Sequence, residues 1–500
     1  MKDYDVIIIG AGNGGLTAGA KLAKEGASVL LLERHNIPGG SATSFCRGRF
    51  EFEVALHQLS GMGSVAQPGP LRGILQDLNV MEKLEFVEMD DLYRVQIKSE
   101  NFNLTLRPDI SKVVDELQQR FPHEKQAIKN FFDFLYLFFT EVIGAYYLHD
   151  PETSPEKYPL YFRYALKSTQ QVFDEFFKDP LLKAVISPYW TYIGLPPSFM
   201  NFSDLAAMFF GFCEFKPYHL KGGSQALSNA LADTITQNKG KIRYNCGVDK
   251  IIVKNSKTEG IITEHGDEIT SKFVISNASK ITTYVDLVGA DHIPEVVTRE
   301  LKQSRVAQSG FILYMGLDCE PDVVGITEST NFIFGNIDMD KAYQQMKVLD
   351  INSQDAMVLS CYDLRDPEFS PPGASQVALV TLKYGHPWLS VPPEQYADQK
   401  YRCADQMLNV IAPLYPELRN HIEEVEVATP ITCMRYLGHP TGSIYGFEHH
   451  IKDTENFIPN KMHINGLLGV GGWVGLCGFQ PTLESGVIAA RSVLRQLGRN

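Results

Sequence analysis

Four residues near the start of the chain have the types and the spacing needed to bind a nucleotide. Gly10, Gly12 and Gly15 follow a G-x-G-x-x-G pattern, and Glu33 comes 21 residues after Gly12. The first two glycines permit a tight turn and let backbone N–H groups approach a pyrophosphate, and the third lets a helix pack closely on a strand. A carboxylate at Glu33 is placed to bind both ribose hydroxyls of an adenosine.

The elements around these residues are those that such a site needs. Residues 6–9 form a short apolar, β-branched run, which is typical of a strand buried on both faces of a parallel sheet. A helical pattern of small residues follows over 16–23, and a second apolar strand over 29–32 ends at Glu33. The helix would offer free amides and the positive end of its dipole to phosphates. This order predicts dinucleotide binding; the alternative is a glycine-rich turn in an ordinary βαβ unit.

The choice of dinucleotide depends on the next residues. Glu33 would repel a 2′-phosphate, which argues against NADP. After Arg34 the chain reads Pro38-Gly39-Gly40-Ser41-Ala42-Thr43. Glu33 followed by this Gly-Gly doublet resembles the second signature of FAD-binding oxidoreductases of the amine oxidase and phytoene desaturase superfamily. The resemblance implies that the doublet passes close to the pyrophosphate and ribityl chain of FAD, which we therefore expect as the cofactor.

Composition bounds the function further. Five hundred residues suffice for two or three domains, and a net charge of −13 argues against a nucleic-acid partner. The eight cysteines are dispersed, without C-x-x-C or a close Cys/His grouping, so we expect buried thiols in a reducing compartment and no disulfide or metal site. No leader is expected before the first strand and no window suggests a transmembrane helix, so a cytoplasmic location is predicted.

Three later segments extend the resemblance. Residues 50–63 look like the stretch that passes beside the flavin ring, in the retinol saturase version at Leu56-His57, whereas residues 38–42 look more like the carotenoid isomerase version. Residues 221–227 (KGGSQAL), Val248 and 274–278 (VISNA) resemble the middle FAD segment, in which the backbone at Val248 meets the adenine. His57 is interpreted either as a proton donor near the flavin or as a hydrogen-bonding wall residue.

The C-terminal segment completes the resemblance. A strand over 467–473 ends in glycines, and a helix is predicted over 482–497 with Pro481 in its first turn. Its N-terminus should point at the flavin pyrimidine edge and favour negative charge there by roughly 0.3–2 kcal/mol. Relatives usually carry an acidic residue where this chain has Gly471-Gly472, so the ribityl contact is expected from the backbone or from elsewhere.

The middle of the chain is rich in aromatic residues. We interpret 111–218 either as a helical insertion with its own core or as a lid over an apolar tunnel that partly faces a membrane. Residues 286–454 are strand-rich and resemble the floor of the family's substrate cavity, and Tyr445 lies in a matching G-x-x-Y-G segment. His449 and His450 would alternate faces on a strand, so they are not expected to form a metal pair.

The resemblance to phytoene desaturases, carotenoid isomerases and retinol saturases covers nearly the whole chain. It implies an α/β fold with a discontinuous Rossmann-type FAD-binding domain (1–70, 219–285 and 455–500), a mixed-sheet substrate-binding domain (71–110 and 286–454) and a helical lid (111–218). The expected catalytic residues are His57 and Tyr445. The residues expected to contact FAD are Gly10, Ala11, Gly12, Asn13, Gly14, Gly15, Glu33, Arg34, Gly39, Gly40, Ser41, Ala42, Thr43, Leu56, His57, Val248, Asn277, Gly472, Trp473, Gln480, Pro481 and Thr482.

The expected chemistry is hydride exchange between flavin N5 and a carbon of an apolar polyene. No second G-x-G-x-x-G motif is found, so the redox partner should be a small soluble molecule, a quinone or a partner protein. Saturation, desaturation and cis–trans isomerisation differ only in electron flow and all stay open. Two other classes also stay open: a flavin amine oxidase, and a non-enzymatic lipid-binding protein of the Rab GDP-dissociation inhibitor type.

Overall fold

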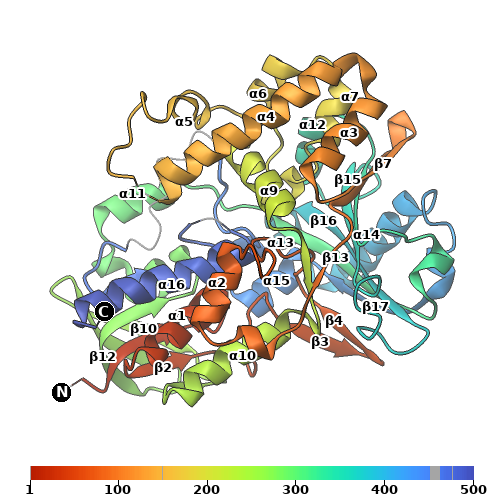
Figure 1. Cartoon of the computed structure of the whole chain (residues 1–500). Coiled ribbons are helices and arrows are strands. Elements are labelled where there is room, and N and C mark those ends of the chain that lie inside the picture. Colours follow the sequence, from red (N-terminus) through yellow and green to blue (C-terminus); the bar gives the residue numbers. More distant parts are fainter. Residues whose placement is uncertain (1, 149, 451–461, 476, 500) are drawn as a thin grey trace.

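The computed structural model describes residues 2–148, 150–450, 462–475 and 477–499. Its first sheet is drawn from distant parts of the chain, in the strand order β10-β11-β12-β1-β2-β9, with β18 paired to β12. Both termini lie beside this sheet (Figure 1). Its strands are β1 (Tyr4–Ile9), β2 (Val29–Leu32), β9 (Lys241–Arg243), β10 (Val248–Lys254), β11 (Lys257–Thr263), β12 (Glu268–Ser276) and β18 (Leu467–Gly469).

The alternation of side chains along β1 explains how both faces of this sheet are buried. Val6 and Ile8 pack against the helices α1 (Asn13–Lys24), α10 (Gly223–Gln237) and α16 (Phe479–Gln496). Ile7 and Ile9 pack on the other face, against apolar residues of β10 and β11. Because successive side chains of a strand point to opposite faces, a continuously apolar strand can satisfy both layers. The parallel pairing of β1 with β2 and with β12 brings three strand ends to one edge.

The second sheet has the strand order β17-β13-β16-β15-β14-β6-β7. One face packs against α14 (Tyr396–Ile411), and the other faces the helical block and a hairpin of β3 (Ser44–Arg47) and β4 (Phe50–Glu53). Its strands are β6 (Tyr93–Ile97), β7 (Phe102–Leu106), β13 (Ser309–Leu317), β14 (Thr330–Phe334), β15 (Ala356–Cys361), β16 (Ser375–Lys383) and β17 (Ile422–Ala428).

A block of helices covers this sheet, at the top of Figure 1. Phe131 lies at its centre, fully buried among the rings of Phe132, Phe173, Phe177 and Phe202. Buried residues of β6 and β14 belong to the same cluster, so the block and the second sheet share one hydrophobic core. Its helices are α3 (Ile110–Arg120), α4 (Lys125–Val142), α5 (Pro159–Tyr164), α6 (Thr169–Phe176), α7 (Pro180–Val185), α8 (Trp190–Ile193) and α9 (Phe202–Glu214).

Some observed elements begin or end a few residues from the boundaries that the sequence predicts, and other elements are not predicted by it. The apolar periodicity of residues 124–147 predicts one long helix, but α4 ends at Val142 and continues as a wider π-helical turn over Ile143–Tyr147. The C-terminal helix begins at Phe479 instead of residue 482, with Gly478 as its N-cap. The hairpin β3–β4 and strand β17 were not expected, because their alternation of charged and apolar residues is short.

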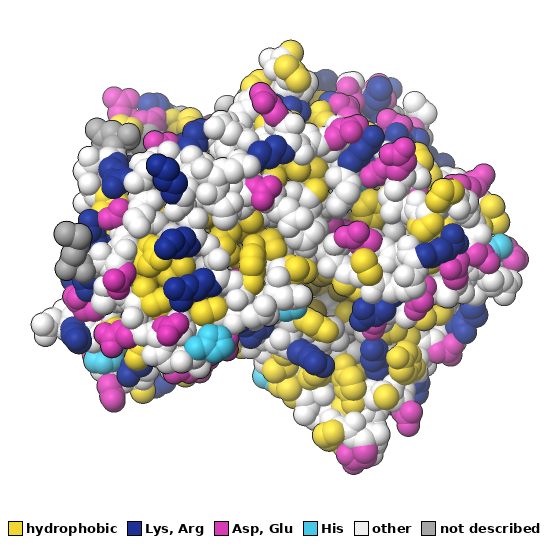
Figure 2. Space-filling model, turned by 90° about the horizontal axis from the view of Figure 1, so that it is seen from below, with side chains coloured by type: hydrophobic (Ala, Val, Ile, Leu, Met, Phe, Trp, Pro, Cys, Tyr) yellow, Lys and Arg dark blue, Asp and Glu magenta, His cyan; other side chains and the backbone are white. Residues whose placement is uncertain are grey.

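The remaining elements join these layers. They are α2 (Pro70–Asp77), β5 (Phe86–Glu88), β8 (Tyr218–Leu220), α11 (Glu295–Gln303), α12 (Met339–Gln345), α13 (Gly385–Leu389) and α15 (Pro430–Leu437). Within the described parts of the chain, we find no helix with both the length and the apolarity to cross a bilayer. Seen from below, the surface carries acidic and basic side chains interspersed with hydrophobic ones, without a field of a single sign (Figure 2).

Candidate functional site

The glycine-rich turn after β1 has no room for side chains. Gly10 has φ = +91°, a conformation that favours glycine. A Cβ atom on Gly15 would lie 2.0 Å from the carbonyl oxygen of Gly10, and one on Gly12 would lie 2.5 Å from Nδ2 of Asn277. The turn thus needs glycine at residues 10 and 15 for backbone reasons, whereas a side chain at Gly12 would require Asn277 to move.

The N-terminus of α1 is open to an anion. Gly12 is its N-cap, no side chain caps the helix, and its first turn contains no acidic residue. Oδ1 of Asn13 is buried without a hydrogen-bond partner among the described residues. Free backbone amides at the positive end of a helix dipole are the arrangement that binds phosphates.

Glu33 and the Gly-Gly doublet both meet this turn. The Glu33 carboxylate accepts hydrogen bonds from the backbone N–H of Ala11 at 2.6 Å and of His35 at 2.8 Å. The N–H of Gly39 donates to the carbonyl of Ala11 at 2.8 Å. The acid expected at the ribose and the doublet expected at the pyrophosphate therefore lie on either side of the first glycines.

The middle and C-terminal segments reach the same place. Asn277 follows β12 and donates its backbone N–H to Ile9 at 2.8 Å. A Cβ atom on Gly14 would lie 2.8 Å from both Oδ1 of Asn277 and the backbone N of Gly471. Nδ2 of Asn13 lies 3.4 Å from Oγ1 of Thr482 in the first turn of α16. Three parts of the chain that are hundreds of residues apart thus surround one open helix end.

The other predicted cofactor residues are placed as follows. The carbonyl of Ala42 accepts from Oγ of Ser228, and Oγ1 of Thr43 bonds Gln225, so this loop is attached to α10. The side chain of Arg34 instead points away, toward the carbonyls of Arg435 and Tyr436. Ser41 and Gly40 belong to the doublet loop, Val248 begins β10, Gln480 and Pro481 lie in the first turn of α16, and Gly472 and Trp473 follow Gly471.

His57 and Tyr445, the two predicted catalytic residues, both lie near Tyr192 of α8. The His57 ring is parallel to the Tyr192 ring, with centroids 6.5 Å apart, and its Nδ1 is buried without a partner among the described residues. Burial lowers the pKa of His57 to about 4, so its imidazole is neutral at pH 7. Tyr445 donates its hydroxyl to the carbonyl of Thr191 at 2.9 Å, and burial raises its pKa.

Sequence reasoning missed Glu53, which holds the loop bearing Leu56 and His57. Its buried carboxylate accepts from the backbone N–H groups of Ala55, Leu56 and Ser224 and from the Ser224 hydroxyl, at 2.7–3.1 Å. Burial raises the pKa of Glu53 although these donors lower it. The signal was present as an acid inside the apolar FEFEV stretch, but its partner on α10 is 171 residues away.

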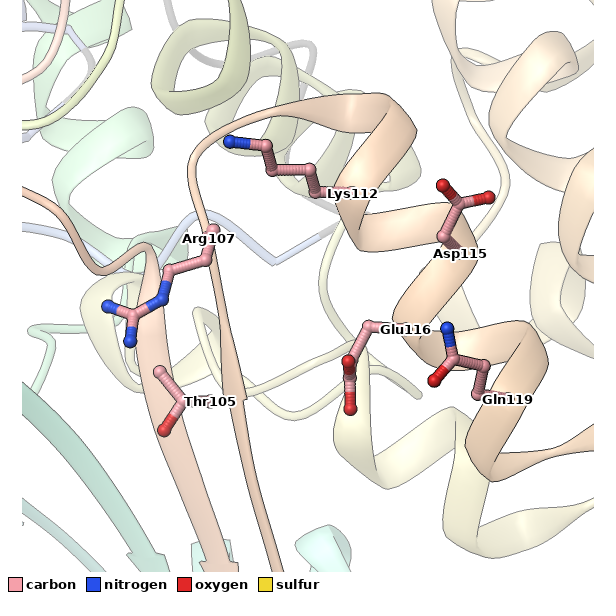
Figure 3. Close-up of a pocket in the computed structure, with 6 residues that line it drawn as sticks. All are labelled: Thr105, Arg107, Lys112, Asp115, Glu116 and Gln119. Carbon is pink, nitrogen blue, oxygen red and sulfur yellow. The ribbon is translucent and has the colours of Figure 1, made fainter.

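A separate pocket opens on the surface between β7 and α3 (Figure 3). It measures about 270 Å³ and is lined by Thr105, Arg107, Lys112, Asp115, Glu116 and Gln119. Arg107 also contacts Glu328 at 3.3 Å. This charged lining does not suit an apolar ligand, and none of the predicted site residues contributes to it.

Comparison with known proteins supports the interpretation of the N-terminal segment as part of a Rossmann-like domain. Residues 8–76 match the NAD(P)-binding Rossmann-like domain. The chain is 27% identical to prolycopene isomerase 2 of an Oncidium hybrid cultivar, over 99% of this chain and 85% of that protein. It is 24% identical to the all-trans-retinol 13,14-reductase of Danio rerio, over 100% of this chain and 87% of that protein. The predicted resemblance is confirmed.

Solved structures confirm the fold class. An oxidoreductase from Methanosarcina mazei superposes with a TM-score of 0.66 at 18% identity, covering 98% of this chain and 100% of the other. A putrescine oxidase bound to putrescine superposes with a TM-score of 0.63 at 13% identity, covering 99% of both chains. At such low identity these likenesses show the fold alone, an α/β architecture with a Rossmann-like domain.

Proposed function

We propose that this protein is an FAD-dependent oxidoreductase that acts on the double bonds of an apolar polyene, such as a carotenoid or a retinoid-like lipid. The observation that carries the proposal is the near full-length similarity to prolycopene isomerases and retinol 13,14-reductases, together with the open N-terminus of α1. The Rossmann-like match and the flavin amine oxidase fold support a flavin-dependent enzyme, and FAD is our proposal for the flavin.

The residues present fit the cofactor. The free amides of Asn13, Gly14 and Gly15 would bind the pyrophosphate, and Glu33 would bind the adenosine ribose. The small residues of the Gly39-Gly40 loop would let the chain follow the cofactor closely. When bound, FAD would supply the ability to exchange a hydride with carbon, which no amino-acid side chain possesses.

The chain's own residues would orient the polyene and control protons. His57 is neutral, so it can accept or share a proton but does not carry a fixed positive charge. The Tyr445 hydroxyl is oriented by the Thr191 carbonyl. The Tyr192 ring lies beside His57 and packs against the rings of Tyr189 and Phe332, and this aromatic group would exclude water. Return of both electrons to the same substrate molecule gives isomerisation, whereas net electron transfer gives saturation or desaturation through a soluble partner or a quinone.

The spectrum of the protein and the products of its reduced form test this proposal. The purified protein should show a flavin spectrum, and its anaerobically reduced form should convert poly-cis-lycopene or retinol, with products separated by chromatography. Isomerised lycopene without flavin oxidation would identify an isomerase, and dihydroretinol formed as the flavin oxidises would identify a saturase. Steady peroxide release with simple amines and no change in either polyene would contradict the proposal.

The variant Glu33→Gln tests the role that we assign to Glu33 at the adenosine ribose. Loss of the carboxylate removes the ribose acceptor, and we expect FAD to bind about tenfold more weakly, in line with one charged hydrogen bond. Flavin fluorescence titration of the apo-protein measures the affinity. Glu51→Gln, an exposed acid on β4, is the matched control and should leave FAD binding unchanged. Equal affinity in Glu33→Gln and wild type would contradict the assigned role.

We also propose that the helical block contacts a lipid surface. Six of its large apolar side chains are exposed within 30 residues of one another: Leu137, Tyr146, Tyr147, Leu148, Phe162 and Leu166. Lys157 and Arg163 lie among them in the sequence and Lys167 directly follows, with Lys157 and Lys167 also forming ion pairs with acidic neighbours. Aromatic and aliphatic side chains with neighbouring cations are typical of helices that rest in a membrane interface, and such a contact would deliver an insoluble substrate.

Vesicle flotation tests this contact. Wild type should float with phosphatidylcholine vesicles containing phosphatidylserine, and Leu148→Ser/Phe162→Ser should remain in the soluble fraction. The control is Leu389→Ser, an exposed leucine of α13 outside the block, which should float like wild type. If the double variant floats as well as wild type, this surface is not the membrane contact.

A further inference from the structure

Three side chains of types that can bind a metal lie together where β13 ends and β17 begins. Asp318 and Cys319 directly follow β13, and His421 directly precedes β17. Their ligand atoms, one from each residue, all lie within 4.8 Å of one another. Nδ1 of His421 is 2.8 Å from Oδ1 of Asp318. Because 102 residues separate Cys319 from His421, their proximity is a product of the sheet pairing alone.

The backbone holds this group in place. β13 and β17 are antiparallel, and Leu317 is paired with Ile422 immediately beside the group. The N–H of Asp318 donates to the carbonyl of His421 at 3.0 Å, and Oγ of Ser375 donates to the carbonyl of Cys319 at 2.7 Å. Only the Asp318 side chain is largely exposed and free to adjust. Two of the three ligands are thus attached to a paired sheet end.

We propose that Asp318, Cys319 and His421 form a binding site for a thiophilic divalent cation, with Zn²⁺ as the expected occupant and water as a fourth ligand. Zn–S bonds of about 2.3 Å and Zn–N or Zn–O bonds of about 2.0–2.2 Å place tetrahedral ligands about 3.2–3.8 Å apart. The three ligand atoms already lie within 4.8 Å of one another, so side-chain movements of about 1 Å would bring them to this spacing. The cation would take the place of the proton now shared between His421 and Asp318.

The surroundings favour a cation at this point. Asp318, Glu320 and Asp322 place three carboxylates within five residues of chain around Cys319. Their negative charge attracts a cation, and a dication would stabilise the thiolate by binding it. Arg49 is a basic residue near Asp318, and its guanidinium is already paired with the Glu423 carboxylate at 2.7 Å. Binding would release a proton from the thiol and connect the ends of β13 and β17.

The test uses the full-length protein, stripped with a chelator and titrated with Co²⁺ and then with Zn²⁺. One equivalent of Co²⁺ should give a thiolate-to-cobalt absorption band in the near ultraviolet, which one equivalent of Zn²⁺ abolishes. Cys319→Ser and His421→Gln should each weaken binding at least about tenfold, and Asp318→Asn, an exposed change that the fold tolerates, should weaken it as well. Cys46→Ser, which removes the exposed cysteine, is the control and should bind like wild type.

Two outcomes would overturn the proposal: no stoichiometric band at micromolar metal, or a band that survives Cys319→Ser and disappears in Cys46→Ser. Thermal melting gives an independent readout, because Zn²⁺ that binds the folded state should raise the Tm of wild type and not of Cys319→Ser. The flavin spectrum should not change on adding metal, so this test stands apart from the proposed enzyme activity.

Discussion

Two helices of this protein, α1 and α10, begin after glycine-rich turns, and only one of them has an open N-terminus. α1 starts after Gly12 with no acid in its first turn. α10 starts after Gly222, where the buried Glu53 carboxylate accepts hydrogen bonds from the N–H and the hydroxyl of Ser224. The same positive helix end thus binds a protein carboxylate in one case and is left for a ligand in the other.

The difference shows that glycines and a helix start do not by themselves make an anion site. What matters is whether the fold brings a carboxylate of its own to the helix end. Glu53 closes α10 and at the same time orients the loop that carries His57. At α1 the Glu33 carboxylate accepts only from the N–H of Ala11, one residue before the N-cap, and Asn277 and Gly471 beside the first turn carry no charge.

The largest expected effect comes from adding a side chain inside the glycine-rich turn. In Gly15→Ala the new Cβ atom would lie 2.0 Å from the Gly10 carbonyl oxygen, so β1 and α1 cannot keep their packing. We expect nearly complete loss of bound flavin and of soluble folded protein, measured from the 450 nm to 280 nm absorbance ratio. Gly73→Ala in α2, which meets nothing within 4 Å, should gain up to about 1 kcal/mol of stability. Normal flavin content in Gly15→Ala would refute the packing argument.

The next effect concerns the half-buried carboxyl of Asp204 in the first turn of α9. Burial raises its pKa from 3.8 to about 7. The folded state therefore keeps a proton that the unfolded state releases between pH 3.8 and 7, so stability falls as pH rises through this window. Asp204→Asn should be more stable than wild type at pH 8, by at most about 4 kcal/mol, and equal to it near pH 4.

Urea unfolding at both pH values measures this difference. Asp133→Asn on α4 is the control, because Asp133 is exposed and paired with Lys129 on the surface. That variant should show no comparable pH-dependent gain. A gain of equal size at pH 4 and pH 8 in Asp204→Asn would mean that the ionisation of this carboxyl is not the cause.

The smallest effect tests the closed helix end. Glu53→Gln keeps the shape of the side chain but turns an NH₂ group toward N–H donors that now bind carboxylate oxygens. We expect a loss of about 1–3 kcal/mol in the free energy of unfolding, measured by urea titration. The loop bearing His57 should also become more susceptible to proteolysis. If Glu53→Gln and the exposed control Glu51→Gln unfold alike, the carboxylate is not what closes α10.

Local sequence patterns could predict much of this architecture. The strands and helix around Gly10, the long helix after residue 124 and the C-terminal helix all carry strong periodicity, and their errors are confined to the ends. The pattern could not show that the helix ends at Val142, because the apolar sequence continues through Ile143–Tyr147, where the π-helical turn buries no side chain fully. Nor could it show that Arg34 turns toward α15, because that contact spans about 400 residues.

The sequence by itself determined the glycine turn and the acid that follows it, because both belong to one strand–helix–strand unit within about 30 residues of chain. Tertiary structure alone decided which helix end stays open, which carboxylate closes the other, and that Cys319 and His421 meet. Each of these depends on contacts between segments more than 100 residues apart. Strand pairing and burial set such contacts, and no short window of sequence contains the information.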